Sequence, residues 1–147
     1  MRWPFFRKKQ ETKIHLCLNY IEDACEMTSW VKDVHYSVLL GNTKVGECDL
    51  RLGMNEELYY AGQIGYRIYY PYRGHGYAYE ACIILFALAK KEYGFHELLI
   101  TCSPENIASH KTLVKLQGTL LKTVRVPSSH WLYQRGETTK EIFYYSL

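Results

Sequence analysis

The 147-residue sequence has no long hydrophobic run, few prolines and little net charge. Its longest wholly apolar stretch covers residues 81–89, and a membrane-spanning helix needs about 20 apolar residues. The formal charge of +3 comes from 18 Lys and Arg against 15 Asp and Glu. This charge is dispersed apart from the run Arg7–Lys9, which we interpret as solvent-exposed. The sequence therefore predicts neither a membrane protein nor a nucleic-acid-binding protein.

Paired cysteine motifs are also missing. The five cysteines contain no C-x-x-C pair and no metal-ligand spacing. Residues 1–9 lack the apolar segment of a signal peptide. We therefore expect reduced thiols in a cytoplasmic protein without a metal cofactor.

The composition is that of an ordinary globular domain. Hydrophobic residues make up 48% and charged residues 22%, which excludes a disordered chain. No repeat or linker interrupts the sequence, so we predict one domain over residues 1–147. Aromatic residues reach 15%, with 14 tyrosines. These tyrosines fit a tyrosine-lined groove and half-buried strands equally well.

Alternating apolar residues predict an antiparallel first half. Expected strands cover residues 13–20, 34–40, 44–52 and 63–70, with a turn at Gly41-Asn42, one short helix within 21–31, and a loop over 53–62. In the strand 44–52, we assign the face with Cys48, Leu50 and Leu52 to the core. The opposite face, away from the core, carries Val45, Glu47, Asp49 and Arg51.

The second half has helical periodicity. An apolar stripe predicts a helix over 76–93 that ends at Gly94. Residues 97–102 are nearly continuously apolar, which is typical of a buried parallel strand. Ser103-Pro104 then begins a helix that ends near Gly118, and strands follow over 119–126 and 141–146. The prediction is a mixed α/β (α+β) fold with a mostly antiparallel sheet of about six to seven strands and a β-α-β-α segment.

Two segments carry chemistry. The glycine-rich segment Tyr70–Ala78 lies between a predicted strand and a long helix. Such a turn and a helix N-terminus together favour a bound anion such as pyrophosphate. The segment is neither a P-loop nor a dinucleotide fingerprint. In the second segment, Pro104–Lys111, Asn106 lies in the first turn of a helix and Ser109 follows one turn later.

These segments resemble the GNAT superfamily of acyl-CoA-dependent N-acetyltransferases, and they lie closest to a little-characterised bacterial branch. Arg73, Gly76 and Ala78 meet the family pattern R/Q-x-x-G-x-G/A, and Asn106 with Ser109 meets the Asn-x-x-Ser/Ala helix. Residues 62–68 look like the family's fourth strand. The resemblance implies transfer of an acetyl group from acetyl-CoA to a primary amine of a small molecule or protein. A non-catalytic acyl-CoA-binding module is the alternative.

The resemblance also implies a cofactor site. Backbone amides of residues 73–78 would hold the CoA pyrophosphate, the pantetheine arm would lie along the fourth strand, and Lys111 would reach a phosphate. The acyl group would lie where the fourth and fifth strands splay apart, with a backbone N–H as oxyanion donor. The implied cofactor-binding residues are Ile68, Tyr70, Arg73, Gly74, His75, Gly76, Tyr77, Ala78, Asn106, Ser109 and Lys111.

The catalytic residues are less defined. A neutral amine must attack, so a general base is useful. Glu47 and Asp49 are the acids to test, although both also fit solvated strand carboxylates. Leu113 stands where many family members have a tyrosine that protonates the CoA thiolate, which leaves Tyr66, Tyr72 or water for that role.

Three further expectations concern structure. Glu80 is interpreted as structural, and Gln117 stands where the family usually has a glycine that ends the helix. The short segment before residue 34 leaves room for one helix where the family has two. The acceptor pocket is therefore expected to be open or completed by a second subunit, which is compatible with a homodimer.

Overall fold

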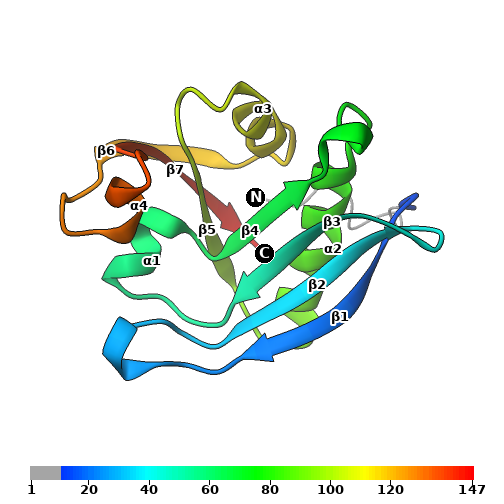
Figure 1. The fold of residues 1–147 in the computed structure, drawn as a ribbon, viewed down its shortest axis with the longest axis horizontal. Helices are drawn as coiled ribbons and strands as arrows, with labels where there is room; N and C mark the ends of the chain where they lie inside the picture. The colour runs from blue at the N-terminus through cyan, green and yellow to red at the C-terminus, as the bar shows by residue number, and fades with distance from the viewer. Residues whose placement is uncertain (1–10) are drawn as a thin grey trace.

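The computed structural model describes residues 11–147, so the run Arg7–Lys9 and the other expectations for residues 1–9 lie outside it. The described residues form seven strands in two sheets with four α-helices (Figure 1). This arrangement confirms the predicted α+β class and the number of strands. Among residues 11–147, no helix combines the length and apolarity needed to cross a membrane.

The front sheet contains four antiparallel strands in the order β1-β2-β3-β4. Alternating side chains of these strands form a core with the long helix α2, which covers one face of the sheet. The opposite face carries polar side chains. The elements are β1 (His15–Glu22), β2 (Asp33–Leu40), β3 (Thr43–Arg51), β4 (Ile64–Ile68) and α2 (Tyr77–Lys91).

The rear sheet is antiparallel with the order β5-β7-β6. Its strands are β5 (Glu97–Cys102), β6 (Thr119–Arg125) and β7 (Thr139–Ser146). The predicted parallel environment of β5 is therefore wrong, because its hydrogen-bonded neighbour is β7. Residues 98–100 are apolar because β5 is covered on both faces: Leu98 and Ile100 lie in the core, and the adjacent strand positions face α1 (Glu56–Ala61).

Hydrogen bonds join the two sheets at Gln63, just before β4, and Leu99 in β5. The backbone N–H of Gln63 donates to the Leu99 carbonyl over 2.8 Å, and the Leu99 N–H donates to the Gln63 side chain over 2.9 Å. Beyond this contact β4 and β5 run apart (Figure 1). The strands therefore splay as the family resemblance implies.

Two local predictions for the first half are wrong, whereas residues 21–31 do hold one short helix, the 3-10 helix η2 (Glu26–Thr28). The expected loop 53–62 contains α1. The Asn55 side chain caps α1 by accepting a hydrogen bond from the Leu58 N–H. Val45 is fully buried because a β-bulge pairs Val38 with Gly46 and Leu39 with Lys44, and the extra residue reverses the alternation.

The helix α3 (Ile107–Lys115) begins later and ends earlier than predicted. Asn106 caps it instead of Ser103, because the Asn106 side chain accepts the Ser109 N–H over 3.1 Å. Gln117 takes the left-handed conformation, with φ of +67°, at the end of the helix. Gly118 lies against the Tyr145 ring, where a Cβ atom would overlap the ring.

Candidate active site

A cleft of about 430 Å³ lies where β4 ends, between the glycine turn and α3. The glycine turn closes one end, the first turns of α3 form a wall, and β4 forms the floor. The lining residues are Tyr66, Arg67, Ile68, Tyr72, Arg73, Gly74, Gly76, Tyr77, Ala78, Asn106, Ala108, Ser109 and Thr112.

The glycine turn has a backbone that only glycine adopts readily. Gly74 and Gly76 have φ values of +86° and +77°. Gly76 is the N-cap of α2, so the first backbone N–H groups of α2 point into the turn without an intrahelical partner. The Arg73 side chain closes the turn by donating from Nε to the Ile68 carbonyl over 2.9 Å. The turn thus offers free N–H groups and the positive end of a helix dipole to an anion.

A hydrogen bond between β4 and α3 crosses the cleft. The Tyr66 hydroxyl lies 2.6 Å from the Ser109 hydroxyl oxygen. Burial raises the pKa of Tyr66 well above its usual value of about 10, so its phenol stays protonated. Leu113, at the position of the family's tyrosine, is fully buried. A different tyrosine, from β4, therefore supplies a hydroxyl group next to α3.

A second hollow of about 300 Å³ lies on the polar face of the front sheet. We call it the acidic groove. Tyr66 and Arg67 line both hollows, so the groove adjoins the cleft at β4. The groove is lined by Asn19, Tyr20, His35, Tyr36, Glu47, Cys48, Asp49, Tyr66 and Arg67.

Charged groups meet at one end of the acidic groove. Asp49 is 8% exposed and accepts a hydrogen bond from Arg51 Nε over 2.8 Å. Asp33, only 2% exposed, lies 3.3 Å from His35 and 3.8 Å from Arg51. Burial and, second, the hydrogen bond with Asp49 raise the pKa of Asp33 to about 8. Near neutral pH, Asp33 is therefore mostly protonated.

The structure brings most of the predicted residues together. Glu47 and Asp49 line the groove, Tyr66 lines both hollows, and eight of the cofactor residues line the cleft. Those eight are Ile68, Arg73, Gly74, Gly76, Tyr77, Ala78, Asn106 and Ser109. Tyr70, His75 and Lys111 are not among the lining residues. Tyr70 is 80% exposed and lies under the Arg73 guanidinium instead.

Other lining residues were not predicted. Thr112 lies one turn after Ser109, so helical spacing offered a signal for it. Asp33 and His35 alternate on one face of β2 and pair with Arg51 and Asp49 of β3. Strand alternation predicts that Asp33 and His35 share one face of β2. It does not predict that β3 lies beside them and completes the charged cluster. Glu80 is structural as predicted, since its carboxylate accepts the Lys13 and Ile14 N–H groups.

Comparison with known proteins identifies the family. Residues 1–119 match the acetyltransferase (GNAT) domain family, and the chain belongs to that family. No curated protein matches the sequence.

Solved structures with the same fold share little sequence with the chain. A GNAT-family acetyltransferase from Bacillus anthracis is 22% identical with a TM-score of 0.61, over 76% of this chain and 65% of that one. The ribosomal-protein-S5-alanine acetyltransferase of Vibrio fischeri is 17% identical with a TM-score of 0.60, over 78% and 61%.

A third similar structure contains coenzyme A. RimL, a ribosomal L7/L12 α-N-protein acetyltransferase solved with coenzyme A linked to one of its cysteines, is 16% identical with a TM-score of 0.62, over 78% and 62%. The chain thus spans less than two thirds of the length of these three structures.

Proposed function

We propose that this protein is an acetyl-CoA-dependent N-acetyltransferase that acts on a primary amine, and that residues 1–147 form one domain. The main support for the proposal is that the anion-binding cleft and the acidic groove adjoin at Tyr66. A transferase that joins two substrates needs two binding sites that meet where the reaction occurs. Membership of the acetyltransferase family supports acetyl-CoA as the donor.

The cleft fits the donor. The N–H groups of the turn around Gly76 suit the pyrophosphate of CoA, and the volume between β4 and α3 suits an extended arm. Acetyl-CoA supplies an activated acetyl group at the splay of β4 and β5. The proposed roles of Tyr70, His75 and Lys111 rest on the family resemblance alone.

The acidic groove fits a cationic acceptor. Glu47 and Asp49 supply negative charge in a protein with a net positive charge, and Tyr20 supplies an aromatic wall. Tyr20 is held in place by stacking on His35, with ring centroids 4.3 Å apart. Carboxylates and aromatic faces both attract an ammonium group. These contacts favour an amine that reaches the groove in its protonated form.

Asp49 is the proposed base. An amine with a pKa of about 10.4 must lose a proton before it attacks. Asp49 pairs with Gly65 in the β3–β4 register, and a Cβ atom on Gly65 would collide with the Asp49 carboxylate. This carboxylate therefore lies directly beside β4. Glu47 lies farther out, where it contacts Lys44 and the Tyr69 hydroxyl.

The departing thiolate needs a proton in turn. The Ser109 hydroxyl lines the cleft, and the Tyr66 hydroxyl 2.6 Å away can replace the proton that Ser109 gives up. Solvent in the acidic groove, which Tyr66 also lines, then returns a proton to Tyr66. We assign this proton transfer to the pair because Tyr66 lines both hollows and Ser109 lines the cleft. The pair performs the role that the tyrosine would have at the position of Leu113.

Release of free CoA thiol from acetyl-CoA, measured with a panel of mono- and diamines, tests the proposal. We expect release to depend on amine, and we expect Asp49→Asn to lower its kcat by about 100-fold or more. Glu47→Gln, which removes a charge from the same groove, should change kcat less than about threefold. Acetyl-CoA binding should persist in both variants.

Two results would contradict the proposal. Amine-independent thiol release, or none at all despite tight acetyl-CoA binding, would favour the non-catalytic acyl-CoA-binding module. A loss of turnover in Glu47→Gln but not in Asp49→Asn would assign the base to Glu47 instead. Thermal unfolding of each variant checks that it folds.

A further inference from the structure

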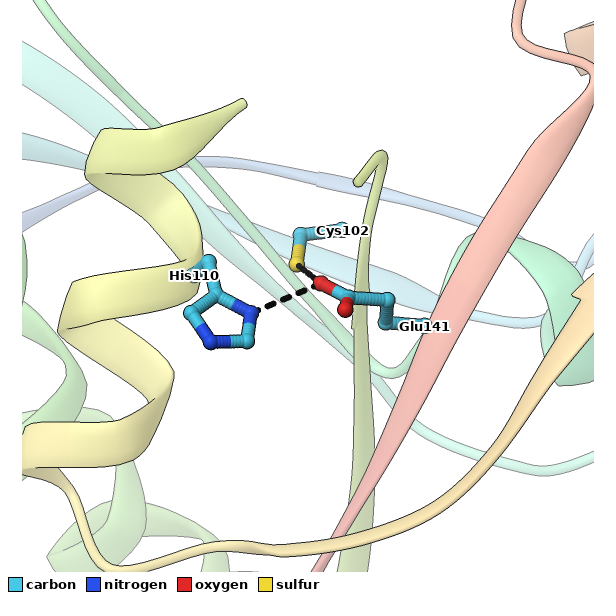
Figure 2. Close-up of side chains that lie close together, drawn as sticks. All are labelled: Cys102, His110 and Glu141. Atoms are coloured by element: carbon cyan, nitrogen blue, oxygen red, sulfur yellow. Dashed lines mark hydrogen bonds and ion pairs between the residues drawn. The ribbon is translucent and has the colours of Figure 1, made fainter. Parts of the chain in front are cut away.

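Three side chains from separate elements converge on one another (Figure 2). Cys102 ends β5, His110 lies in α3, and Glu141 lies in β7. The Cys102 thiol donates to Glu141 Oε1 over 3.3 Å, and His110 Nδ1 lies 2.8 Å from the same oxygen. None of the three lines the cleft or the acidic groove, so the proposed acetyl transfer does not use them.

The order of contacts excludes a nucleophilic cysteine. In a catalytic Cys-His pair the imidazole takes the thiol proton, and a carboxylate orients the imidazole. Here Glu141 lies between Cys102 and His110 instead. Burial and the Glu141 carboxylate raise the pKa of Cys102 to about 12. The thiol therefore stays protonated unless a cation replaces its proton.

The donor set is that of a zinc site. Zinc takes thiolate, imidazole and carboxylate ligands at about 2.0–2.3 Å, which places tetrahedral ligand atoms about 3.5 Å apart. The three ligand atoms already lie within 4.8 Å of one another. A divalent ion, a thiolate, a carboxylate and a neutral imidazole sum to zero charge, which suits a largely buried position.

We propose that Cys102, His110 and Glu141 bind one zinc ion, with water as the fourth ligand. Binding releases the thiol proton of Cys102 to solvent, and the sulfur then coordinates the metal. The His110 side chain is 38% exposed, which leaves a path for the ion and the water. The His110 ring also lies edge-on to the Phe143 ring, at 5.7 Å between centroids, and this contact limits its rotation.

A bound ion would connect β5, β7 and α3. The ion would hold α3 at His110, the residue that follows Ser109. A bound ion would therefore fix the position of one wall of the cleft. The ligands are 8 and 31 residues apart in the chain, which explains why no metal-binding motif marks them in the sequence. The three proposed zinc ligands take no part in the proposed acetyl transfer itself.

Cobalt(II) is the spectroscopic probe for the test, because a thiolate ligand gives cobalt a near-ultraviolet charge-transfer band. The host is the full chain with Cys17→Ser and Cys25→Ser, which removes the two exposed thiols. We expect one equivalent of cobalt to give the thiolate band and tetrahedral visible bands, and one equivalent of zinc to displace them. Zinc should also raise the midpoint of thermal unfolding.

Matched variants locate the site. Cys102→Ser should abolish the charge-transfer band, and His110→Ala should weaken zinc binding at least about tenfold. Cys48→Ser, at a buried thiol outside the cluster, should leave the band intact. His35→Ala should do so too, and it removes a ligand from the other group of side chains in residues 11–147 that is arranged for a metal, Glu22, Asp33 and His35.

The proposal is overturned if the host gives no thiolate band with cobalt, or if the band persists in Cys102→Ser. It is also overturned if His35→Ala, rather than His110→Ala, lowers the zinc affinity. Circular dichroism of each metal-free variant shows whether a lost band reflects a lost fold.

Discussion

Asp33 carries a buried carboxyl group, with only 2% of the residue exposed. Its carboxyl is buried beside Asp49, and Arg51 and the Trp30 N–H face it from the other side. His35 and Glu22 complete the surrounding charges. Burial dominates, and the pKa of Asp33 rises from 3.8 to about 8. The folded protein therefore holds a proton there that the unfolded chain has lost.

This proton makes stability depend on pH. Between about pH 4 and pH 8 the folded state binds one more proton than the unfolded state, so the free energy of unfolding falls as the pH rises. The steepest slope from one such group is about 1.4 kcal/mol per pH unit. Asp33→Asn imitates the protonated acid and can still donate to Asp49. We expect this variant to gain stability relative to wild type as the pH rises from 5 to 8.

Denaturant unfolding at several pH values measures the difference. Asp23→Asn, an exposed acid just after β1, is the matched control and should show no such trend. If Asp33→Asn is equally stabilising or destabilising at pH 5 and pH 8, the buried carboxyl does not hold the extra proton.

Residue patterns predicted part of the site. The two motifs located Gly76, Asn106 and Ser109 because they lie at fixed places on helix N-termini. The hydrogen bond between Tyr66 and Ser109 joins β4 to α3, and no pattern within either segment contains it. The charged cluster around Asp33 could not be predicted either, because it forms only when β2 pairs with β3.

At the scale of elements, the end of α3 has an unfavourable feature. Gln117 holds a left-handed backbone conformation, which costs a non-glycine residue about 1–2 kcal/mol. Glycine adopts this conformation freely but loses more entropy on folding. We therefore expect Gln117→Gly to raise the free energy of unfolding by up to about 1 kcal/mol, as measured by denaturant titration.

At the neighbouring Gly118, we expect a substitution to lower the free energy of unfolding. Gly118→Ala should destabilise by about 1–3 kcal/mol, because its Cβ atom would overlap the buried Tyr145 ring. The Tyr145 hydroxyl donates to the Leu113 carbonyl over 2.7 Å, so the ring has little room to move. A stabilising Gly118→Ala and a destabilising Gln117→Gly would contradict this description of the helix end.

Periodicity predicted the long elements well and the short ones badly. The helix α2 and the strand β5 match their predicted ranges closely, because each has many apolar residues in one register. The short helix α1 was predicted as a loop, although Asn55 and Glu56 form a typical helix start. The bulge at Val45 changes the register by one residue, and alternation within β3 alone does not reveal it.

At the scale of the whole molecule, the splay between β4 and β5 positions the cleft. Hydrogen bonds between Gln63 and Leu99 join the two sheets at one end of β4, and the strands separate toward α3 (Figure 1). The cleft and the acidic groove then adjoin through β4. Sequence alone predicted one sheet of about six to seven strands, and the separation of β4 from β5 came only through the family resemblance.

Calorimetric titration with acetyl-CoA tests whether the glycine turn binds the pyrophosphate of acetyl-CoA. Gly76→Asp and Gly76→Asn are a matched pair. Both side chains tolerate the positive φ at this position, and a Cβ atom there meets no other atom within 4 Å. The two variants therefore differ only in charge.

We predict that wild type binds acetyl-CoA, that Gly76→Asn binds with similar affinity, and that Gly76→Asp binds at least about tenfold more weakly, a difference of about 1.4 kcal/mol. Repulsion between the Asp carboxylate and the pyrophosphate is the physical reason. If wild type does not bind acetyl-CoA, or if the Asp and Asn variants bind equally well, the glycine turn is not the pyrophosphate site.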